Sequence, residues 1–174
     1  MTPRPKVQPD PRLRLLELYD EALPEVYGYL FSRCGARALA EDLTAETFLA
    51  AVNGTQLEIP PVITVGWLIG IARHKLVDHW RRQERERRGL QVLGGRREEP
   101  EDPWDERLDA MVVREVLENL EPHYRAALTL RYLDGLPVPQ VAEYLGRGVR
   151  SAEGLLVRAR TAFRLAYQER GEAR

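Results

Sequence analysis

Apolar residues recur at helical spacing through most of this chain, and no strand-like alternation extends beyond a few residues. In the segment after Leu13, for example, the apolar side chains follow the period of 3.6 that marks one face of a helix. The pattern predicts an all-α fold. The expected helices cover about 12–20, 24–33, 37–53, 65–88 and 105–119, followed by one starting at Pro122, one over 138–145 and a last one capped by Ser151.

Prolines, glycines and charge divide this pattern into two helical domains. Pro24 is tolerated only in the first turn of a helix, which predicts separate helices on its two sides. Residues 1–11 hold four prolines and no apolar period, so we expect a disordered lead-in. The segment 85–104 is dense in mixed charge, glycine and proline, which is typical of a linker. The predicted domains are therefore 12–84 and 105–170.

Charge is distributed unevenly, although the formal net charge is only -1. Eight acids face two arginines between residues 17 and 58, whereas seven arginines face three glutamates from Gly146 onward. An acidic N-terminal part and a basic C-terminal part favour different binding partners for the two halves of the chain. Only Lys6 and Lys75 are lysines among 26 basic residues, which suits phosphate and base contacts or reflects a GC-rich genome.

The sequence lacks the residue patterns that several classes of protein require. Cys34 is the single cysteine, so no disulfide framework exists, and His74, His79 and His123 show no metal-ligand spacing. No pair of a catalytic nucleophile and its base can be recognised in the sequence, so we expect neither an enzyme nor a bound cofactor or metal. The N-terminus lacks the apolar core of a signal peptide, and no apolar run is long enough to span a membrane. We expect a soluble protein of the reducing cytoplasm.

The segment 120–164 has the pattern of a helix-turn-helix. Ala142 is small where two helices would cross, a turn with two glycines follows, and arginines lie opposite the apolar stripe of the last helix. In this motif the start of the second helix contacts base edges and phosphates. A plain three-helix bundle with solvated arginines remains an alternative. The candidate DNA contacts are Arg147, Arg150, Ser151, Glu153, Gly154 and Arg158.

Two earlier segments carry surface chemistry of their own. The helix around AEDLTAETFLAAV, 40–52, is acidic with an aromatic edge, which suits docking on a basic protein or is simply a solvated helix face. The segment WLIGIARHKLVDHWRR, 67–82, mixes aromatic, histidine and arginine side chains as single-stranded DNA binding requires. Trp67 is more simply interpreted as a core residue.

In this order, the three segments resemble the bacterial RNA polymerase sigma factors of the extracytoplasmic function (ECF) class of the sigma-70 family. Residues 40–49 resemble the region that binds the polymerase core. Residues 67–82 resemble the region that opens and reads the −10 element. Residues 133–160 resemble the region that reads the −35 element. The resemblance covers most of the chain, and three ordered motifs are more specific than any one alone.

This resemblance implies an alternative sigma factor with a sigma-2 and a sigma-4 domain, without sigma-3 or region 1.1. Its implied partners are core RNA polymerase (clamp helices of the largest subunit, and the flap), promoter DNA and an anti-sigma factor. The residues implied for polymerase binding are Glu41, Asp42, Thr44, Glu46 and Phe48. Those implied for the −10 element are Arg73, His74, Lys75, Asp78, Arg81 and Arg82, and the helix-turn-helix set above would contact the −35 element.

The chain also departs from the family pattern. His74 stands where an asparagine is usual, and Pro137-Val138-Pro139 replaces a serine-led helix cap. Glu153 and Leu155 replace a lysine and an arginine, which lowers the nonspecific phosphate attraction. The family's −35 sequence therefore does not transfer to this chain.

Two other function classes fit parts of the pattern. A stand-alone helix-turn-helix regulator would bind an operator without polymerase. A helical interaction protein, such as an anti-sigma factor or adaptor, would not contact DNA.

Overall fold

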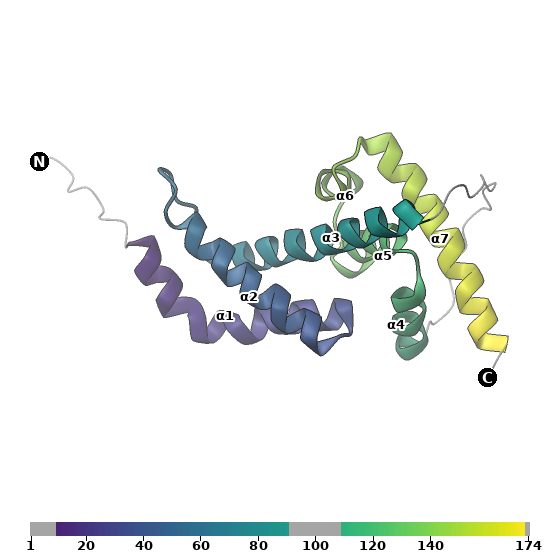
Figure 1. Cartoon of the computed structure of the whole chain (residues 1–174), viewed down its shortest axis with the longest axis horizontal. Helices are drawn as coiled ribbons and strands as arrows, with labels where there is room; N and C mark the ends of the chain where they lie inside the picture. The colour runs from purple at the N-terminus through teal and green to yellow at the C-terminus, as the bar shows by residue number, and fades with distance from the viewer. Residues whose placement is uncertain (1–9, 91–108, 173–174) are drawn as a thin grey trace, which may run out of the picture. The chain divides into compact units, whose positions relative to one another are not determined.

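The computed structural model describes residues 10–90 and 109–172, and within these ranges it contains helices and no strands (Figure 1). This confirms the predicted all-α fold. By their contacts the residues form two compact units, Met1–Leu76 and Val77–Arg174, and the division falls inside one long helix. The first six residues of the segment predicted as a linker, 85–90, are the end of that helix.

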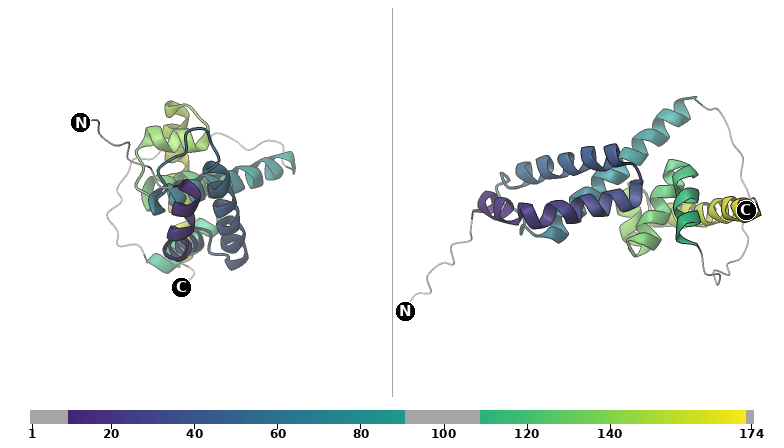
Figure 2. Two further views of the ribbon diagram at one scale, coloured as in Figure 1. Left: turned by 90° about the vertical axis from the view of Figure 1, so that its left-hand side faces the viewer. Right: turned by 90° about the horizontal axis from the view of Figure 1, so that it is seen from below.

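The first unit is built on two antiparallel helices, α1 (Pro11–Cys34) and α2 (Arg37–Gly54), which lie side by side in Figures 1 and 2. Gly35, with φ of 72°, ends α1 and reverses the chain in the left-handed conformation that glycine adopts without strain. The first part of α3 (Val65–Leu90) adds Leu68, Ala72 and Leu76, spaced four residues apart and all buried.

The prediction of two helices around Pro24 is wrong, because α1 continues through it. Proline inside a helix removes one N–H donor and crowds the preceding turn. The buried side chains on either side of Pro24 nevertheless form one unbroken stripe, and burying this stripe against α2 outweighs the local cost. The stripe consists of Leu15, Leu18, Ala22, Val26 and Leu30.

The buried face of α2 includes small side chains. Ala40 and Thr44 are buried, whereas Leu39 is only half-buried. Small side chains on this face allow α1 to approach closely. Trp67 is also half-buried rather than fully core, and its ring packs against Gly54, 3.0 Å from the position a β-carbon there would take. Gly54 is therefore required by close packing.

The second unit contains the end of α3 and all the helices from α4 onward. The last helix, α7, packs against α4, α5 and α6 around a core that includes Val116, Leu128 and Phe163. The bounds are α4 (Ala110–Asn119), α5 (Pro122–Leu128), the π-helical turn η1 (Thr129–Leu133), α6 (Val138–Leu145) and α7 (Val149–Glu172).

Helix starts in the second unit differ from the predicted ones. α4 begins at Ala110 rather than at 105, because the Asp109 carboxylate accepts from the Met111 N–H at 2.8 Å and caps the helix; 105–108 lie outside the described residues. α7 begins at Val149, two residues before the predicted cap Ser151. The Gly148 carbonyl already accepts the Ala152 N–H at 3.0 Å, so Ser151 lies within the first turn.

Replacing Pro24 with alanine tests whether α1 is one helix. The change restores a backbone donor inside the helix, and we expect the protein to gain about 1–2 kcal/mol after the greater freedom of the unfolded chain is subtracted. Pro122→Ala is the control, because Pro122 occupies a first-turn position where proline is favoured. Urea denaturation measures both; a loss of stability in Pro24→Ala would indicate two separate helices.

Candidate protein and nucleic-acid interfaces

The acidic side of α2 is exposed, as the docking hypothesis requires. Glu41, Asp42 and Glu46 point to solvent. Glu41 accepts a hydrogen bond from Arg37 at 2.8 Å, and Glu46 lies 3.6 Å from the Lys75 ammonium group of α3. Exposed pairs of this kind contribute little to stability. Their carboxylates therefore remain available to a basic partner.

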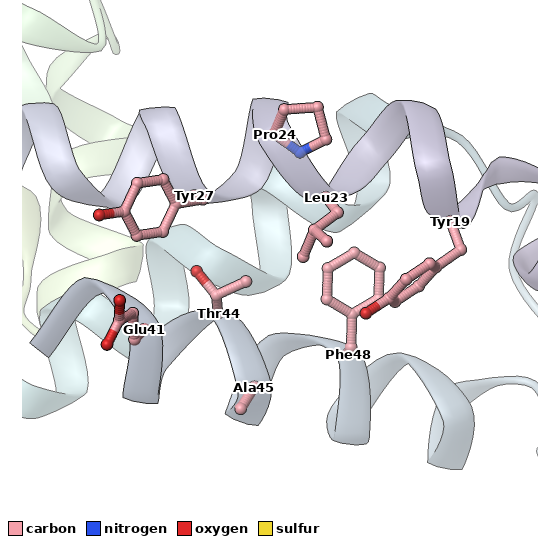
Figure 3. Close-up of a pocket in the computed structure, with 8 residues that line it drawn as sticks. All are labelled: Tyr19, Leu23, Pro24, Tyr27, Glu41, Thr44, Ala45 and Phe48. Atoms are coloured by element: carbon pink, nitrogen blue, oxygen red, sulfur yellow. The ribbon is translucent and has the colours of Figure 1, made fainter. Parts of the chain in front are cut away.

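An apolar groove runs between α1 and α2 beside these acids (Figure 3). Tyr19 of α1 and Phe48 of α2 meet edge to face at one end, with ring centroids 5.0 Å apart, and the Glu41 carboxylate lies near the other end. Such a groove fits an apolar side chain flanked by basic residues. The sequence predicted the α2 side of this surface but missed the α1 side, whose lining residues are Tyr19, Leu23, Pro24 and Tyr27.

Thr44 differs from the other residues of the predicted polymerase-binding set. It is only 6% exposed, and its hydroxyl donates to the Ala40 carbonyl of the preceding turn at 2.7 Å. The hydroxyl is therefore already used within α2. Thr44 lines the groove with its methyl surface and has no free donor to offer.

The candidate −10 residues share the polar side of α3. His74, Asp78, Arg81 and Arg82 are exposed, and Arg73 and Lys75 are half-buried. Arg73 lies 5.8 Å above the centre of the Tyr29 ring, and Arg81 is 3.6 Å from Asp78 on the adjacent turn. The helix thus presents a mainly cationic surface backed by apolar side chains, as contact with nucleic-acid phosphates requires.

The candidate −35 residues surround the start of α7. Arg147, Arg150, Ser151, Glu153 and Arg158 are exposed, and Gly154 is half-buried. Gly146 ends α6 with φ of 61°, and the short turn after it brings arginines to the N-terminus of α7. A helix N-terminus carries partial positive charge and unpaired N–H groups, both of which favour a phosphate.

The sequence suggested that Leu155 stands in place of an arginine that would contact phosphates. The structure gives a different reason for this leucine. The side chain is 1% exposed and belongs to the buried face of α7 with Ala152 and Leu156. An arginine at this position would bury a charge in the core. Only Glu153 therefore reduces the positive charge of the exposed face.

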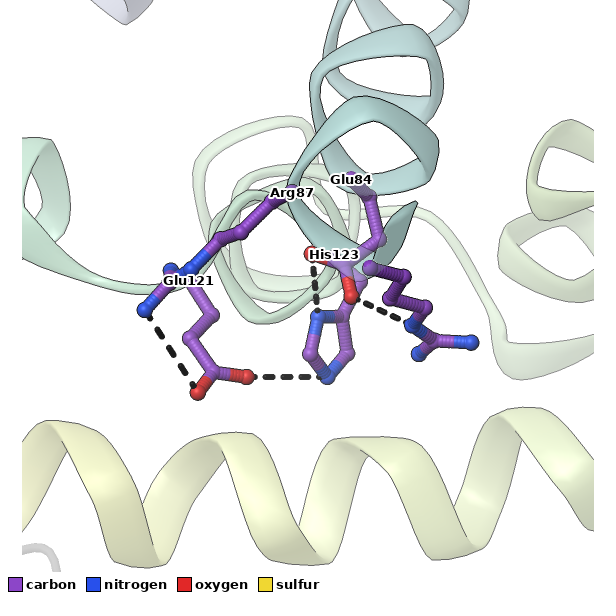
Figure 4. Close-up of polar contacts among 5 residues, drawn as sticks. Glu84, Arg87, Glu121 and His123 are labelled. Atoms are coloured by element: carbon purple, nitrogen blue, oxygen red, sulfur yellow. Dashed lines mark hydrogen bonds and ion pairs between the residues drawn. The ribbon is translucent and has the colours of Figure 1, made fainter. Parts of the chain in front are cut away.

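Sequence reasoning missed a cluster in the second unit. Glu84, Glu121 and His123 each offer one ligand atom within 4.8 Å of the others, a grouping that could hold a metal ion (Figure 4). Glu84 lies in an arginine-rich stretch whose sequence is typical of a solvated surface, far from His123 in sequence, and no periodicity links the two.

Among the described helices, none is long and apolar enough to span a membrane.

Comparison with known proteins identifies the family. The model of sigma-70 region 2 matches residues 18–86, and that of sigma-70 region 4 matches residues 110–163. The ECF sigma factor SigL of Mycobacterium tuberculosis is 30% identical over 169 residues, which are 90% of each protein. This chain belongs to the ECF sigma factors of the sigma-70 family.

Other relatives agree with this assignment. The ECF sigma factor BldN of Streptomyces coelicolor is 34% identical over 157 residues, and the chain spans 58% of the length of BldN. The fold resembles that of the sigma factor RpoE of Bartonella quintana, solved with the anti-sigma factor NepR, with a TM-score of 0.54 and 20% identity over 90% of this chain and 96% of that one. The sigma factor therefore shares its helical architecture with a solved relative.

Replacing Thr44 with valine separates its buried role from a contact with the polymerase. Because the hydroxyl is used inside α2, we expect affinity for core polymerase to stay within about twofold of wild type, and stability to change by about 1 kcal/mol or less. Fluorescence anisotropy of the labelled sigma factor with purified core measures the affinity. A tenfold loss in a fully folded variant would assign the hydroxyl to the interface.

Proposed function

We propose that this alternative sigma factor directs promoter-specific initiation through three exposed helix faces. The residues 12–84 would act as the sigma-2 domain, 105–170 as the sigma-4 domain, and 85–104 as their connection. The observation that supports this best is that the region 2 and region 4 matches occur in order, the first containing the exposed polar faces of α2 and α3 and the second that of α7. The role is non-enzymatic, and we infer that it is exercised in the cytoplasm.

The polymerase contact would lie on α2. Glu41, Asp42 and Glu46 supply carboxylates, and the groove ending at Phe48 supplies apolar surface. Charge at the rim favours encounter with a basic partner, whereas burial of an apolar side chain supplies most of the affinity. The partner surface would be the clamp helices of the largest core subunit, with the flap receiving the sigma-4 domain.

Promoter DNA would be held at two points. The polar face of α3, from Arg73 to Arg82, would contact the opened −10 strand, with arginines on phosphates and His74 near a base. The start of α7 would enter the major groove at the −35 element. Glu153 weakens phosphate attraction there, so the −35 contact would be too weak to act without the polymerase.

An anti-sigma factor is a further proposed partner. The solved relative RpoE was determined in complex with one. In this chain the apolar groove between α1 and α2 and the exposed acids would suit such a protein as well as the polymerase. The two would therefore compete for the same surface.

In vitro transcription with purified core polymerase on a genomic fragment library tests the function. We expect initiation only when both core and this chain are present, from sites that share a −35/−10 pair. Binding of the chain alone to a palindromic duplex, with no transcription, would support the stand-alone regulator instead. Absence of both activities would favour a helical interaction protein.

Substitutions should separate the two kinds of contact. Asp42→Ala is expected to weaken core binding about tenfold, because it removes a rim charge that attracts the basic partner, and to leave −35 preference unchanged. Arg158→Ala should lower −35-dependent initiation about tenfold and reduce the salt dependence by about one unit, with unchanged core affinity.

Matched controls lie on α4, outside the proposed interfaces. Glu118→Ala and Arg114→Ala remove an exposed pair at 3.4 Å, and neither should alter core binding or promoter preference. Core affinity is measured by fluorescence anisotropy. Promoter preference is measured by in vitro transcription from templates with and without the −35 element. Loss of core binding in Arg158→Ala would mean that the roles of the two regions are reversed.

A further inference from the structure

An arginine on α1 lies next to the proposed −10 surface of α3, although no sequence pattern singled it out. The guanidinium carbon of Arg33 lies 3.9 Å from the centre of the Tyr29 ring, one turn earlier on the same helix. The guanidinium carbon of Arg73, a residue of the −10 set, lies 5.8 Å from the same ring centre. Two arginines from different helices therefore meet at one tyrosine, and we call these three residues the paired-arginine site.

Contacts within α1 hold the side chain of Arg33 in place. Its Nη1 group donates a hydrogen bond to the Tyr29 carbonyl at 3.2 Å and another to the Ser32 hydroxyl at 2.8 Å. The Ser32 hydroxyl donates to the same carbonyl at 2.9 Å. An unrestrained arginine loses side-chain freedom when a partner orders it, whereas Arg33 is ordered before any partner binds. The paired-arginine site is therefore preorganised for a ligand.

The tyrosine ring allows two cations to lie close together. Arg33 and Arg73 are within about 10 Å of each other, because both lie near one ring, and like charges at this distance repel. The negative face of an aromatic ring attracts a cation within about 6 Å and offsets part of this repulsion. An anion bound to both guanidinium groups would add attraction. All three side chains are half-buried, so part of each is open to such a ligand.

The place of the site in the fold indicates which anion it binds. Arg73 belongs to the cationic side of α3, and Arg33 extends that surface onto α1. The planar guanidinium group matches the oxygens of a phosphate, and a nucleic-acid strand carries a phosphate at every nucleotide. The ligand that fits two arginines on adjacent helices is therefore the backbone of a strand lying across both.

Arg33 also has an ordinary structural role to be weighed against this one. It lies in the last turn of α1, where a cation stabilises the C-terminal end of a helix without any ligand. That role depends on the charge of Arg33 but does not involve Arg73 or the Tyr29 ring. The contribution of the ring and the salt dependence of strand binding therefore separate the two roles.

We propose that Arg33 binds a backbone phosphate of the opened −10 strand beside Arg73, and that Tyr29 is a positioning residue for both guanidinium groups. The proposal rests on the proposed function, which places the −10 strand on α3. Phosphate contacts fix the position of a strand without reading its sequence. Arg33 therefore contributes affinity and register, and base preference is left to α3.

Binding of the full chain to a fluorescently labelled single strand of about 20 thymidines tests the proposal, with anisotropy measured over a range of salt concentrations. Arg33→Gln should weaken binding about fivefold at low salt and reduce the slope of log affinity against log salt by about 0.7, the value for one phosphate of a single strand. Arg33→Lys should restore the slope, because it keeps the charge. Arg114→Gln on α4 is the matched control and should leave affinity and slope unchanged.

Substitutions of Tyr29 test the positioning role. Tyr29→Phe keeps the aromatic face and should bind the strand as wild type does. Tyr29→Leu keeps an apolar side chain but removes that face, so we expect about threefold weaker binding. Thermal denaturation of each variant shows whether the fold is intact.

Four outcomes would overturn the proposal. The first is an Arg33→Gln variant that binds the strand as tightly as Arg114→Gln. The second is weaker binding with an unchanged salt slope, which would assign Arg33 to the stability of α1. The third is equal loss in Tyr29→Phe and Tyr29→Leu, which would assign the effect to the hydroxyl. The fourth is loss of affinity for core polymerase with unchanged strand binding, which would make the site a protein interface.

Strand binding requires neither polymerase nor a promoter sequence, so the two proposals can fail separately. The expected effects of Arg33 and Tyr29 on strand binding, together with no core-dependent transcription, would contradict the proposed function alone.

Discussion

The structure of this sigma factor depends on one constraint, which is that each helix buries an apolar face on one side. Each helix with a proposed recognition surface is held by an apolar face behind it: Leu43 and Ala51 behind the acids of α2, Leu68 and Ala72 on α3, and Leu155 and Ala159 on α7. Burial of these faces fixes the rotation of each helix, and this rotation decides which side chains reach solvent. Each proposed binding residue is therefore positioned by buried residues of its own helix.

This constraint explains why much of the fold could be predicted from the sequence. Apolar spacing predicted helical structure at each of the α-helices of the described residues, and α6 has the predicted bounds 138–145. Local signals were less reliable. Pro24 predicted a break that the continuous stripe of α1 overrides, and Ser151 predicted a cap although the helix begins at Val149. The π-helical turn at Thr129–Leu133 has no sequence signal that we recognised.

Candidate site residues could be predicted from the sequence where they are charged, exposed and grouped on one helix. The exceptions involve contacts between distant segments. Thr44 fits the family motif, yet its hydroxyl is used inside α2, and the α1 side of the groove becomes visible only when the two helices are paired. Glu84 and His123 belong to different motifs, so only the folded chain brings them together.

We propose that two exposed helix faces contact two promoter elements only in the presence of core polymerase. Photo-crosslinking amino acids placed at Arg82 of α3 and Arg150 of α7, on a promoter labelled at single positions, would detect these contacts. We expect position 82 to crosslink to the −10 strand and position 150 to the −35 duplex, each only with core present. Crosslinks of equal yield without core, or of both positions to one element, would contradict it.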